Sequence, residues 1–146
     1  MNPGGNMEAR FPGTLESLPL LHDAVARFCG GQAVRPDAAF KIDLALEEVF
    51  SNIVRHGYGD GRPHEITVRL ERRRGRVRIQ VDDDGRPFDP LLAPEADVAA
   101  PLDERRPGGL GIHLVRRLLD QIRYQRRPDG NRLILVKRLG AEERST

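Results

Sequence analysis

Three polar residues at helical spacing, Glu48, Asn52 and His56, stand in the stretch DLALEEVFSNIVRHGYGDG that runs from residue 43 to residue 61. At about 100° per residue they form one row along the edge of an apolar stripe, whereas Glu47 falls well away from Asn52. A carboxylate can accept a proton from an attacking hydroxyl, and a neutral amide oxygen is a hard ligand suited to Mg²⁺. Glu48 and Asn52 could therefore act together on a metal-bound phosphate, although Glu-x-x-x-Asn by itself is common and usually marks a solvated helix edge.

An acidic turn follows the alternating residues of a predicted strand, in the sequence VDDDGRPFDP from Val81 to Pro90. A carboxylate at a strand end, such as Asp83, can accept a hydrogen bond from an exocyclic amine, and Gly85 lets the backbone approach a flat ring. An ordinary acidic β-turn uses the same residue types. A calcium loop is set aside because the further ligands and the distal Glu of an EF-hand are missing.

A glycine-rich segment opens a third predicted helix, with the sequence Pro107-Gly108-Gly109-Leu110-Gly111. Backbone N–H groups at a helix start attract phosphate, and glycines permit its close approach. The spacing is not that of a P-loop, and no strand directly precedes the segment, so a Rossmann fingerprint does not fit either. A phosphate-binding segment and a plain flexible turn are the two interpretations of these residues.

Hydrophobic periodicity predicts the elements that would position these residues, in the order β-α-α-β-β-loop-α-β-β. The second helix, from Pro36 to the glycines after His56, has the apolar stripe Ile42, Ala45, Leu46, Val49 and Ile53. Strict alternation over 64–71 and 77–81 predicts a hairpin with one buried face. The other predicted elements are a strand at 9–13, a helix that is N-capped by Ser17 and reaches Cys29, a helix after Gly111, and strands at 121–127 and 131–138.

The long segment from Leu91 to Gly109 has little periodicity and several Pro and Gly breakers. A loop of this length in a compact domain is usually functional or disordered, and we interpret it as a mobile lid. Strands in hairpins with helices on one face predict an α+β two-layer α/β sandwich, with a mixed, mostly antiparallel sheet. The strand at Leu133–Val136 is apolar on both faces and is expected to be central.

The composition suits one domain over residues 1–146, with 38% hydrophobic and 32% charged residues and a net charge of +2. No apolar run approaches the roughly 18 residues of a membrane helix, and no signal-peptide pattern opens the chain. The single Cys29 fits a reducing cytoplasm. The basic run ERRRGRVR (71–78) has no interleaved aromatics, so we expect a hairpin turn and an outer strand face there instead of a nucleic-acid site.

The order and spacing of these motifs resemble the GHKL ATPase superfamily, which includes gyrase, histidine kinases and the MutL repair proteins. The resemblance covers about residues 9–138 and implies the Bergerat (GHKL) ATP-binding fold. The small size, the helix sequence EEVFSNIVRHGYGDG and the ending GGLGIHLVRRLLDQIRYQR are similar to one branch of it. That branch consists of the anti-sigma factor serine/threonine kinases of bacterial sporulation and stress regulation.

The resemblance implies roles for the three residues of the second helix. Glu48 matches the family's general base, and Asn52 matches its Mg²⁺ ligand. His56 stands where His is common in this branch, and we expect it to be a packed, hydrogen-bonded side chain.

The resemblance also implies which residues hold the base and the phosphates. Asp83 matches the carboxylate that bonds the adenine amine, with Gly85 beside the ring. The phosphate-cradling lid and helix start match Gly108, Gly109, Leu110 and Gly111. One departure is Pro87, which replaces the second Gly of the usual Asp-x-Gly-x-Gly motif and removes a backbone N–H; we interpret it as a subfamily trait that leaves nucleotide binding in place.

The function that the resemblance implies is a cytoplasmic, ATP-dependent protein serine/threonine kinase that phosphorylates a STAS-domain anti-anti-sigma partner. It also implies ATP and Mg²⁺ as cofactors, binding of an RNA polymerase sigma factor in transcription regulation, and a homodimer; direct binding of nucleic acid or membrane is not expected. Two alternatives stay open. One is a non-catalytic, nucleotide-responsive module that sequesters a partner. The other is the catalytic half of a split histidine kinase, against which the lack of a phospho-accepting helical hairpin argues.

Overall fold

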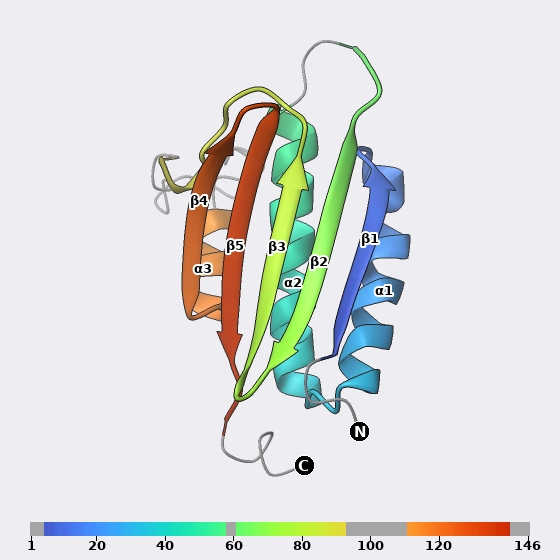
Figure 1. Ribbon diagram of the computed structural model, residues 1–146, viewed down its shortest axis with the longest axis vertical. Helices are drawn as coiled ribbons and strands as arrows, with labels where there is room; N and C mark the ends of the chain where they lie inside the picture. The colour runs from blue at the N-terminus through green and yellow to red at the C-terminus, as the bar shows by residue number, and fades with distance from the viewer. Residues whose placement is uncertain (1–4, 58–60, 93–110, 141–146) are drawn as a thin grey trace, which may run out of the picture.

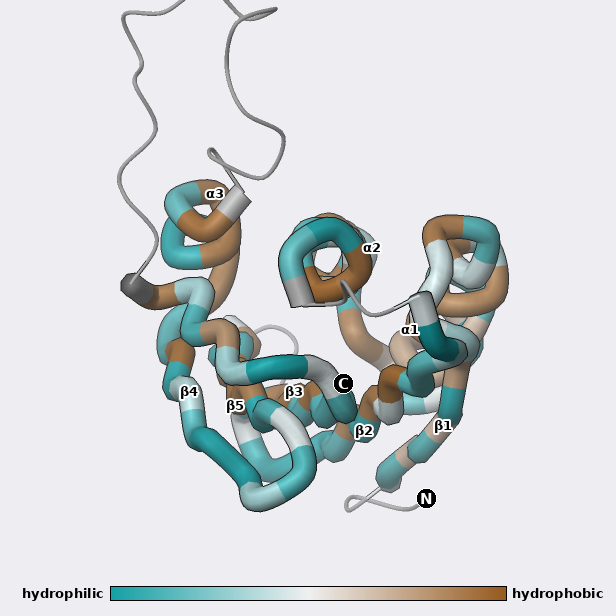
Figure 2. Tube along the Cα trace, turned by 90° about the horizontal axis from the view of Figure 1, so that it is seen from above, coloured by the Kyte–Doolittle hydropathy of each residue, from teal (hydrophilic) through white to brown (hydrophobic). Residues whose placement is uncertain are grey.

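The computed structural model describes residues 5–57, 61–92 and 111–140. In this part of the chain, three α-helices cover one face of a five-stranded sheet (Figure 1). The helices lie side by side, with α2 between α1 and α3 (Figure 2). The elements in chain order are β1 (Asn6–Pro12), η1 (Leu15–Ser17), α1 (Leu18–Gly31), α2 (Pro36–Asn52), the π-helical turn η2 (Ile53–Gly57), β2 (Glu65–Arg73), β3 (Arg76–Asp83), η3 (Pro90–Leu92), α3 (Gly111–Leu118), β4 (Gln121–Arg127) and β5 (Gly130–Arg138).

The sheet has the strand order β1-β2-β3-β5-β4, and each of its four strand pairings is antiparallel. The predicted α+β sandwich is confirmed, but the prediction of a mixed sheet was wrong. The physical reason is the position of β5. Strands β3 and β4 run in the same direction (Figure 1), and β5 returns between them in an antiparallel hairpin, so the parallel pair never becomes adjacent. The apolar strand that was expected to be central therefore lies inside the sheet, flanked on both sides.

The hydrophobic core lies between the sheet and the three helices. The alternating residues of β2 and β3 point into it, and the whole predicted stripe of α2 is buried. Helix α2 contributes because its apolar residues recur at i, i+3, i+4 and i+7, which keeps them on one side of a helix. The predicted core residues that are buried in the structure are Ile42, Ala45, Leu46, Val49, Ile53, Ile66, Val68, Leu70, Val77, Ile79 and Val81.

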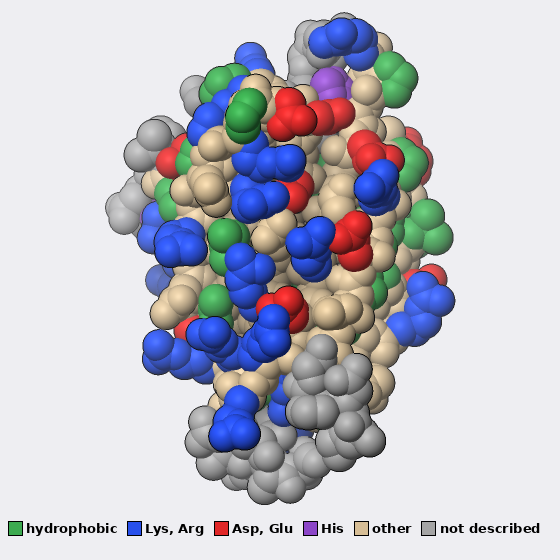
Figure 3. All heavy atoms as spheres, in the orientation of Figure 1, with side chains coloured by type: hydrophobic (Ala, Val, Ile, Leu, Met, Phe, Trp, Pro, Cys, Tyr) green, Lys and Arg blue, Asp and Glu red, His purple; other side chains and the backbone are tan. Residues whose placement is uncertain are grey.

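The face of the sheet opposite the helices is rich in arginine (Figure 3). The basic run at 71–78 forms the β2–β3 hairpin and part of this outer face, as predicted; its turn uses Gly75 at a positive φ of 74°, which favours glycine. Ile134 and Val136 of β5 are also on this face yet are only 8% and 6% exposed. Long arginine stems can cover such apolar residues while their charged ends stay in water.

Ser17 occupies the residue before α1 but does not cap it with its side chain. Its hydroxyl donates instead to the carbonyl of Pro12, at 2.8 Å. The predicted position of the helix start was right, and the predicted side-chain cap was wrong, because Ser17 already belongs to the one-turn helix η1 and its backbone is helical.

Helices α1 and α2 are joined by His22, whose two ring nitrogens contact two carboxylates. Nδ1 lies 2.7 Å from Asp43, and Nε2 lies 2.8 Å from Glu47. Both contacts are satisfied when the imidazole carries both protons. Burial lowers the pKa of His22, but the hydrogen bonds and charges of the two carboxylates outweigh burial and raise its pKa above the usual 6.5.

This contact predicts a pH-dependent contribution to stability. Because the folded-state pKa is raised, the contribution is fully present below the unfolded pKa of about 6.5 and is lost as the pH rises through the folded pKa. Replacing His22 by Gln should therefore lower the free energy of unfolding more near pH 5.5 than near pH 8.5. Since the ring is one-third exposed, we expect a difference below about 1 kcal/mol. Urea unfolding at both pH values measures it; an equal loss at both would contradict the prediction.

Within the described residues, none of the helices is both long enough and apolar enough to span a bilayer.

Candidate functional site

A pocket lies where the C-terminal end of α2 approaches the end of β3 and the start of β5. Asn52 is the last residue of α2, and Asp83 is the last residue of β3. We call this the α2–β3 pocket. Its lining is mainly apolar and aromatic with a few polar groups, the usual character of a small-molecule site, and consists of Val49, Asn52, Ile53, Asp83, Phe88, Pro90, Ile112, Tyr124, Asn131, Arg132 and Leu133.

Asn52 stands at the pocket with an unsatisfied side-chain oxygen. The residue is 6% exposed, and its Oδ1 atom has no hydrogen-bond partner among the described residues. Buried amide oxygens almost always have a partner, so an orphaned one needs an explanation such as a missing ion or ligand. This acceptor suits a hard cation. The described residues contain no group of three His, Cys, Asp or Glu side chains arranged to hold a metal ion, but Mg²⁺ in phosphate sites needs only one or two protein ligands.

Asp83 lines the α2–β3 pocket, and the protein donates hydrogen bonds to one of its two carboxylate oxygens. Oδ1 accepts hydrogen bonds from the backbone N–H of Gly85, at 2.8 Å, and from Nδ2 of Asn131, at 3.1 Å. Oδ2 has no partner among the described residues and is left for a ligand donor. Burial raises the pKa of Asp83, and the two hydrogen bonds partly offset that rise. Gly85 is also buried, and its N–H bonds to Asp83. The two residues predicted to contact the adenine ring therefore lie together.

Asn131 of β5 lines the α2–β3 pocket, and the sequence analysis did not single it out. It is 4% exposed and makes contacts with all of its side-chain polar atoms. Nδ2 also donates to the carbonyl of Arg86, at 2.8 Å, and Oδ1 accepts from the backbone N–H of Phe88, at 3.2 Å, and from the hydroxyl of Tyr124. It can do this because β3 and β5 pair with Asn131 directly opposite Asp83. Only the register of β3 and β5 shows that Asn131 contacts Asp83. In the sequence, an Asn after Asp-Gly indicates a turn.

Removing the Asn131 side chain should weaken the site and the fold together. Asn131→Ala removes the acceptor of the Phe88 N–H and of the Tyr124 hydroxyl, and it takes one of two donors from the buried carboxylate of Asp83. We expect this to lower the free energy of unfolding by about 2–4 kcal/mol. Denaturant unfolding measures this loss. Gln125→Ala on the neighbouring strand is the matched control, because Gln125 is exposed; a loss below about 1 kcal/mol at Asn131, within the range of an ordinary mutation, would refute its proposed central role.

Glu48 lies on α2 one turn before Asn52 and is half-buried. Burial raises its pKa, the charge of Glu47 raises it further, and Arg55 lowers it. Glu47 itself is turned to the other side of the helix, where it contacts His22 of α1. The separation of the two glutamates that was expected from the helix angle is therefore present in the structure. Glu48 is not part of the pocket lining, and it stands at the same flank of α2 as Asn52.

His56 differs from its expected role. It is exposed, and among the described residues its ring has no hydrogen bond; the ring instead lies 5.7 Å from that of Phe88, with 31° between the planes. The physical reason is the π-helical turn at the end of α2, which places His56 over the loop after β3. Its carbonyl, not its ring, is the hydrogen-bonding group, and it accepts from Arg86.

Part of the predicted phosphate site lies outside the described residues. This holds for Gly108, Gly109 and Leu110, and for all of the predicted lid except its first two residues, which belong to η3. Gly111 is the first residue of α3. Ile112, the next residue, lines the α2–β3 pocket, so the start of α3 lies at the same pocket as Asn52 and Asp83.

Comparison with known proteins adds to this geometry. The family model described as a histidine kinase-like ATPase domain matches residues 11–137. Serine/threonine-protein kinase BtrW of Bordetella bronchiseptica is 34% identical over 103 residues, which are 70% of this chain and 72% of the relative. Serine-protein kinase RsbW of Bacillus subtilis is 24% identical over 146 residues, with coverage of 97% and 90%.

Solved structures show the same fold. A structure of the RsbU and RsbW domains of a Mycobacterium tuberculosis protein superposes with a TM-score of 0.64 at 17% identity, over 92% of this chain. The chain spans only 32% of that protein's length. The histidine kinase domain of a blue-light activated kinase from Erythrobacter litoralis superposes with a TM-score of 0.55 at 20% identity, over 84% of this chain and 63% of that one.

Proposed function

Because the chain belongs to the histidine kinase-like ATPase domain family, we propose that it is an ATP-dependent protein serine/threonine kinase of the anti-sigma type. The family and the relatives named as serine kinases agree with the GHKL branch expected from the sequence. The family implies ATP binding. Phosphotransfer by this particular chain, its acceptor and its metal go beyond the comparisons and are the content of the proposal.

The observation that carries the proposal is the pairing of Asn52 and Asp83 at one pocket. Asp83 lines the pocket, and both of its protein donors meet Oδ1, so its second carboxylate oxygen can accept from the exocyclic amine of adenine. Asn52 offers an orphaned amide oxygen at the end of α2. A nucleotide would thus place its base at Asp83 and its phosphates toward Asn52 and the start of α3, where helix N–H groups favour anions.

Asn52 is the residue that would hold Mg²⁺, which when bound would neutralise charge on the phosphates. Glu48, on the same flank of α2, is the proposed base. It accepts the proton of a Ser or Thr hydroxyl on the partner while that oxygen bonds to the γ-phosphorus and the bond to the ADP oxygen breaks. Burial raises the pKa of Glu48, which makes its carboxylate a stronger base than that of an exposed glutamate. Positioning supplies most of the acceleration in this class of reaction.

The acceptor follows from the resemblance of the chain to the anti-sigma kinases. We propose a STAS-domain anti-anti-sigma protein as the substrate, an RNA polymerase sigma factor as the second partner, and a homodimer in the cytoplasm as the working form. The phosphorylation state of the STAS partner would then decide whether the sigma factor is held or released.

Calorimetry and phosphotransfer together test this function. We expect wild type to bind ATP more tightly with Mg²⁺ than with EDTA, and Asn52→Ala to bind ATP equally in both conditions. Incubation with ATP and a Ser-bearing STAS protein should yield acid-stable phosphate on the STAS protein. Absence of nucleotide binding would refute the proposal, whereas acid-labile phosphate would indicate a histidine kinase. Binding of nucleotide and partner without any transfer would indicate a non-catalytic module.

A further inference from the structure

Arg86 is fixed at both ends to elements that carry the site. Its main-chain carbonyl accepts a hydrogen bond from Nδ2 of Asn131 on β5, at 2.8 Å. Its guanidinium donates through Nε and Nη2 to the main-chain carbonyl of His56 in η2, at 3.2 and 2.9 Å. One residue therefore ties the loop after β3 to β5 on one side and to the end of α2 on the other.

The contact with His56 is one that a helix end favours. The last carbonyls of a helix lack partners within it and carry a partial negative charge. A guanidinium that approaches with two N–H groups satisfies such a carbonyl and complements its charge. His56 lies in η2, four residues beyond Asn52. The contact therefore acts on the turn that directly follows the proposed metal ligand.

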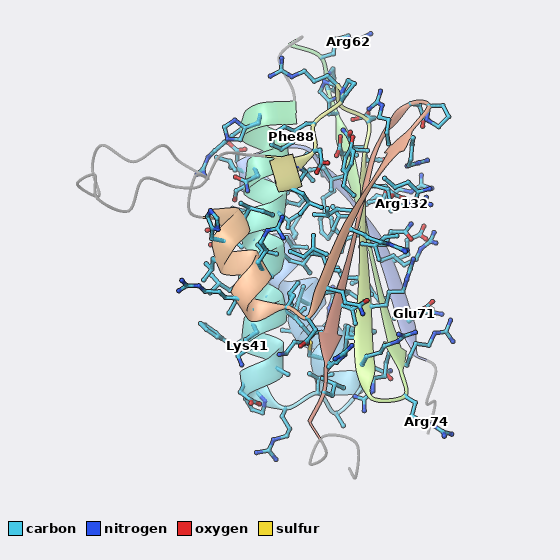
Figure 4. All side chains as sticks on the ribbon, turned by 90° about the vertical axis from the view of Figure 1, so that its left-hand side faces the viewer. Lys41, Arg62, Glu71, Arg74, Phe88 and Arg132 are labelled. Carbon is cyan, nitrogen blue, oxygen red and sulfur yellow. The ribbon has the colours of Figure 1, made fainter. Side chains whose placement is uncertain are left out.

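Phe88 lies between the same two segments. Its ring lines the α2–β3 pocket and packs against the ring of His56, and its N–H donates to Oδ1 of Asn131. Figure 4 shows Phe88 on the helix side of the sheet, near the upper end of α2, whereas Arg132 points away from the helices. Phe88 is thus a wall of the pocket that is held from β5 and from η2 together.

We propose that Arg86 is a positioning residue that holds the end of α2 against the loop after β3. It sets the separation of Asn52 from Asp83 and keeps the ring of Phe88 in the pocket wall beside the adenine ring. This inference rests on the proposed function, since the separation of Asn52 and Asp83 matters only if one nucleotide contacts both residues. The sequence analysis assigned Arg86 no role, because the contact joins residues 30 positions apart.

The expected effect is moderate because the bond between Arg86 and His56 is exposed to water. Exposed hydrogen bonds contribute little to overall stability, so the loss should appear in the geometry of the pocket before it appears in unfolding. We expect Arg86→Met, which keeps the stem and removes the donors, to weaken Mg²⁺-ATP binding about three- to tenfold. Arg123→Met is the matched control, since Arg123 is exposed on β4.

A double-mutant cycle separates this role from a general loss of structure. In the Asn52→Ala background the proposed Mg²⁺ ligand no longer contributes to ATP binding. Adding Arg86→Met should therefore change ATP affinity by less than about twofold. Calorimetry of the four proteins measures the coupling. Additive losses in the cycle would overturn the inference. Failure of the wild type to bind any ATP would instead refute the proposed function.

A readout without nucleotide tests the contact directly. The chain has no tryptophan, so Phe88→Trp would give one fluorophore at the pocket wall. Acrylamide quenching of that tryptophan should rise about twofold when Arg86→Met is added, as the wall is released to solvent, and should not change with Arg123→Met. Unchanged quenching would show that Arg86 does not hold Phe88, whether or not the protein binds ATP.

Discussion

Replacing Asp83 by Asn should lower ATP affinity by about 30- to 100-fold, equivalent to about 2–3 kcal/mol. The structure gives a specific reason for so large an effect. Two donors, the N–H of Gly85 and Nδ2 of Asn131, point at Oδ1. An Asn amide would therefore turn its oxygen to that side and present its NH₂ group to the pocket. The NH₂ group would then face the amine of adenine, donor against donor.

Asp84→Asn is the matched control for this measurement. Asp84 is the next residue, but it is 49% exposed and contacts His64 instead of the pocket. Its replacement should change ATP affinity by less than about twofold, within the range of ordinary surface substitutions. Calorimetric titration of both variants and of wild type decides the point. Equal affinities of wild type and Asp83→Asn for ATP would remove Asp83 from base recognition.

Replacing Glu48 by Gln should lower the rate of phosphotransfer about 10²- to 10⁴-fold, the range that a general base supplies. ATP affinity should stay within about threefold, because the proposed role of Glu48 is toward the acceptor hydroxyl and not toward the nucleotide. Single-turnover transfer of labelled phosphate to the STAS partner measures the rate. The glutamine keeps the shape of the side chain and removes its basicity, so fold and partner binding should be unaffected.

Glu47→Gln gives the corresponding control on the same helix. Glu47 contacts His22 on the α1 side, so its replacement should leave the transfer rate within a few-fold of wild type. The pH profile offers a second check. Burial and the charge of Glu47 raise the pKa of Glu48, so the acidic limb of the rate profile should lie above the usual glutamate range. Equal loss of activity in both variants would assign the effect to helix packing.

The elements of this fold could be predicted from local patterns. The stripe from Ile42 to Ile53 predicts α2 because five apolar residues fall on one side of a helix, and all five are buried. The alternation in β2 and β3 predicts their hairpin for the same kind of reason. Side-chain capping at Ser17 and the mixed sheet were wrong because both depend on what the chain does elsewhere: a preceding one-turn helix, and the insertion of β5 between two strands.

The candidate site divides in the same way. Glu48 and Asn52 share a flank of α2 because they are one helical turn apart, and the sequence alone determines that. The roles proposed for Asn131, Arg86 and Phe88 depend on contacts that only the tertiary structure shows. Asn131 meets Asp83 because of the antiparallel register between β5 and β3, and Arg86 meets His56 because the loop after β3 passes the end of α2. Contacts between residues 30 to 48 positions apart depend on strand order and register, which no local residue pattern specifies, because the free energy that selects them comes from burying the whole sheet against the helices.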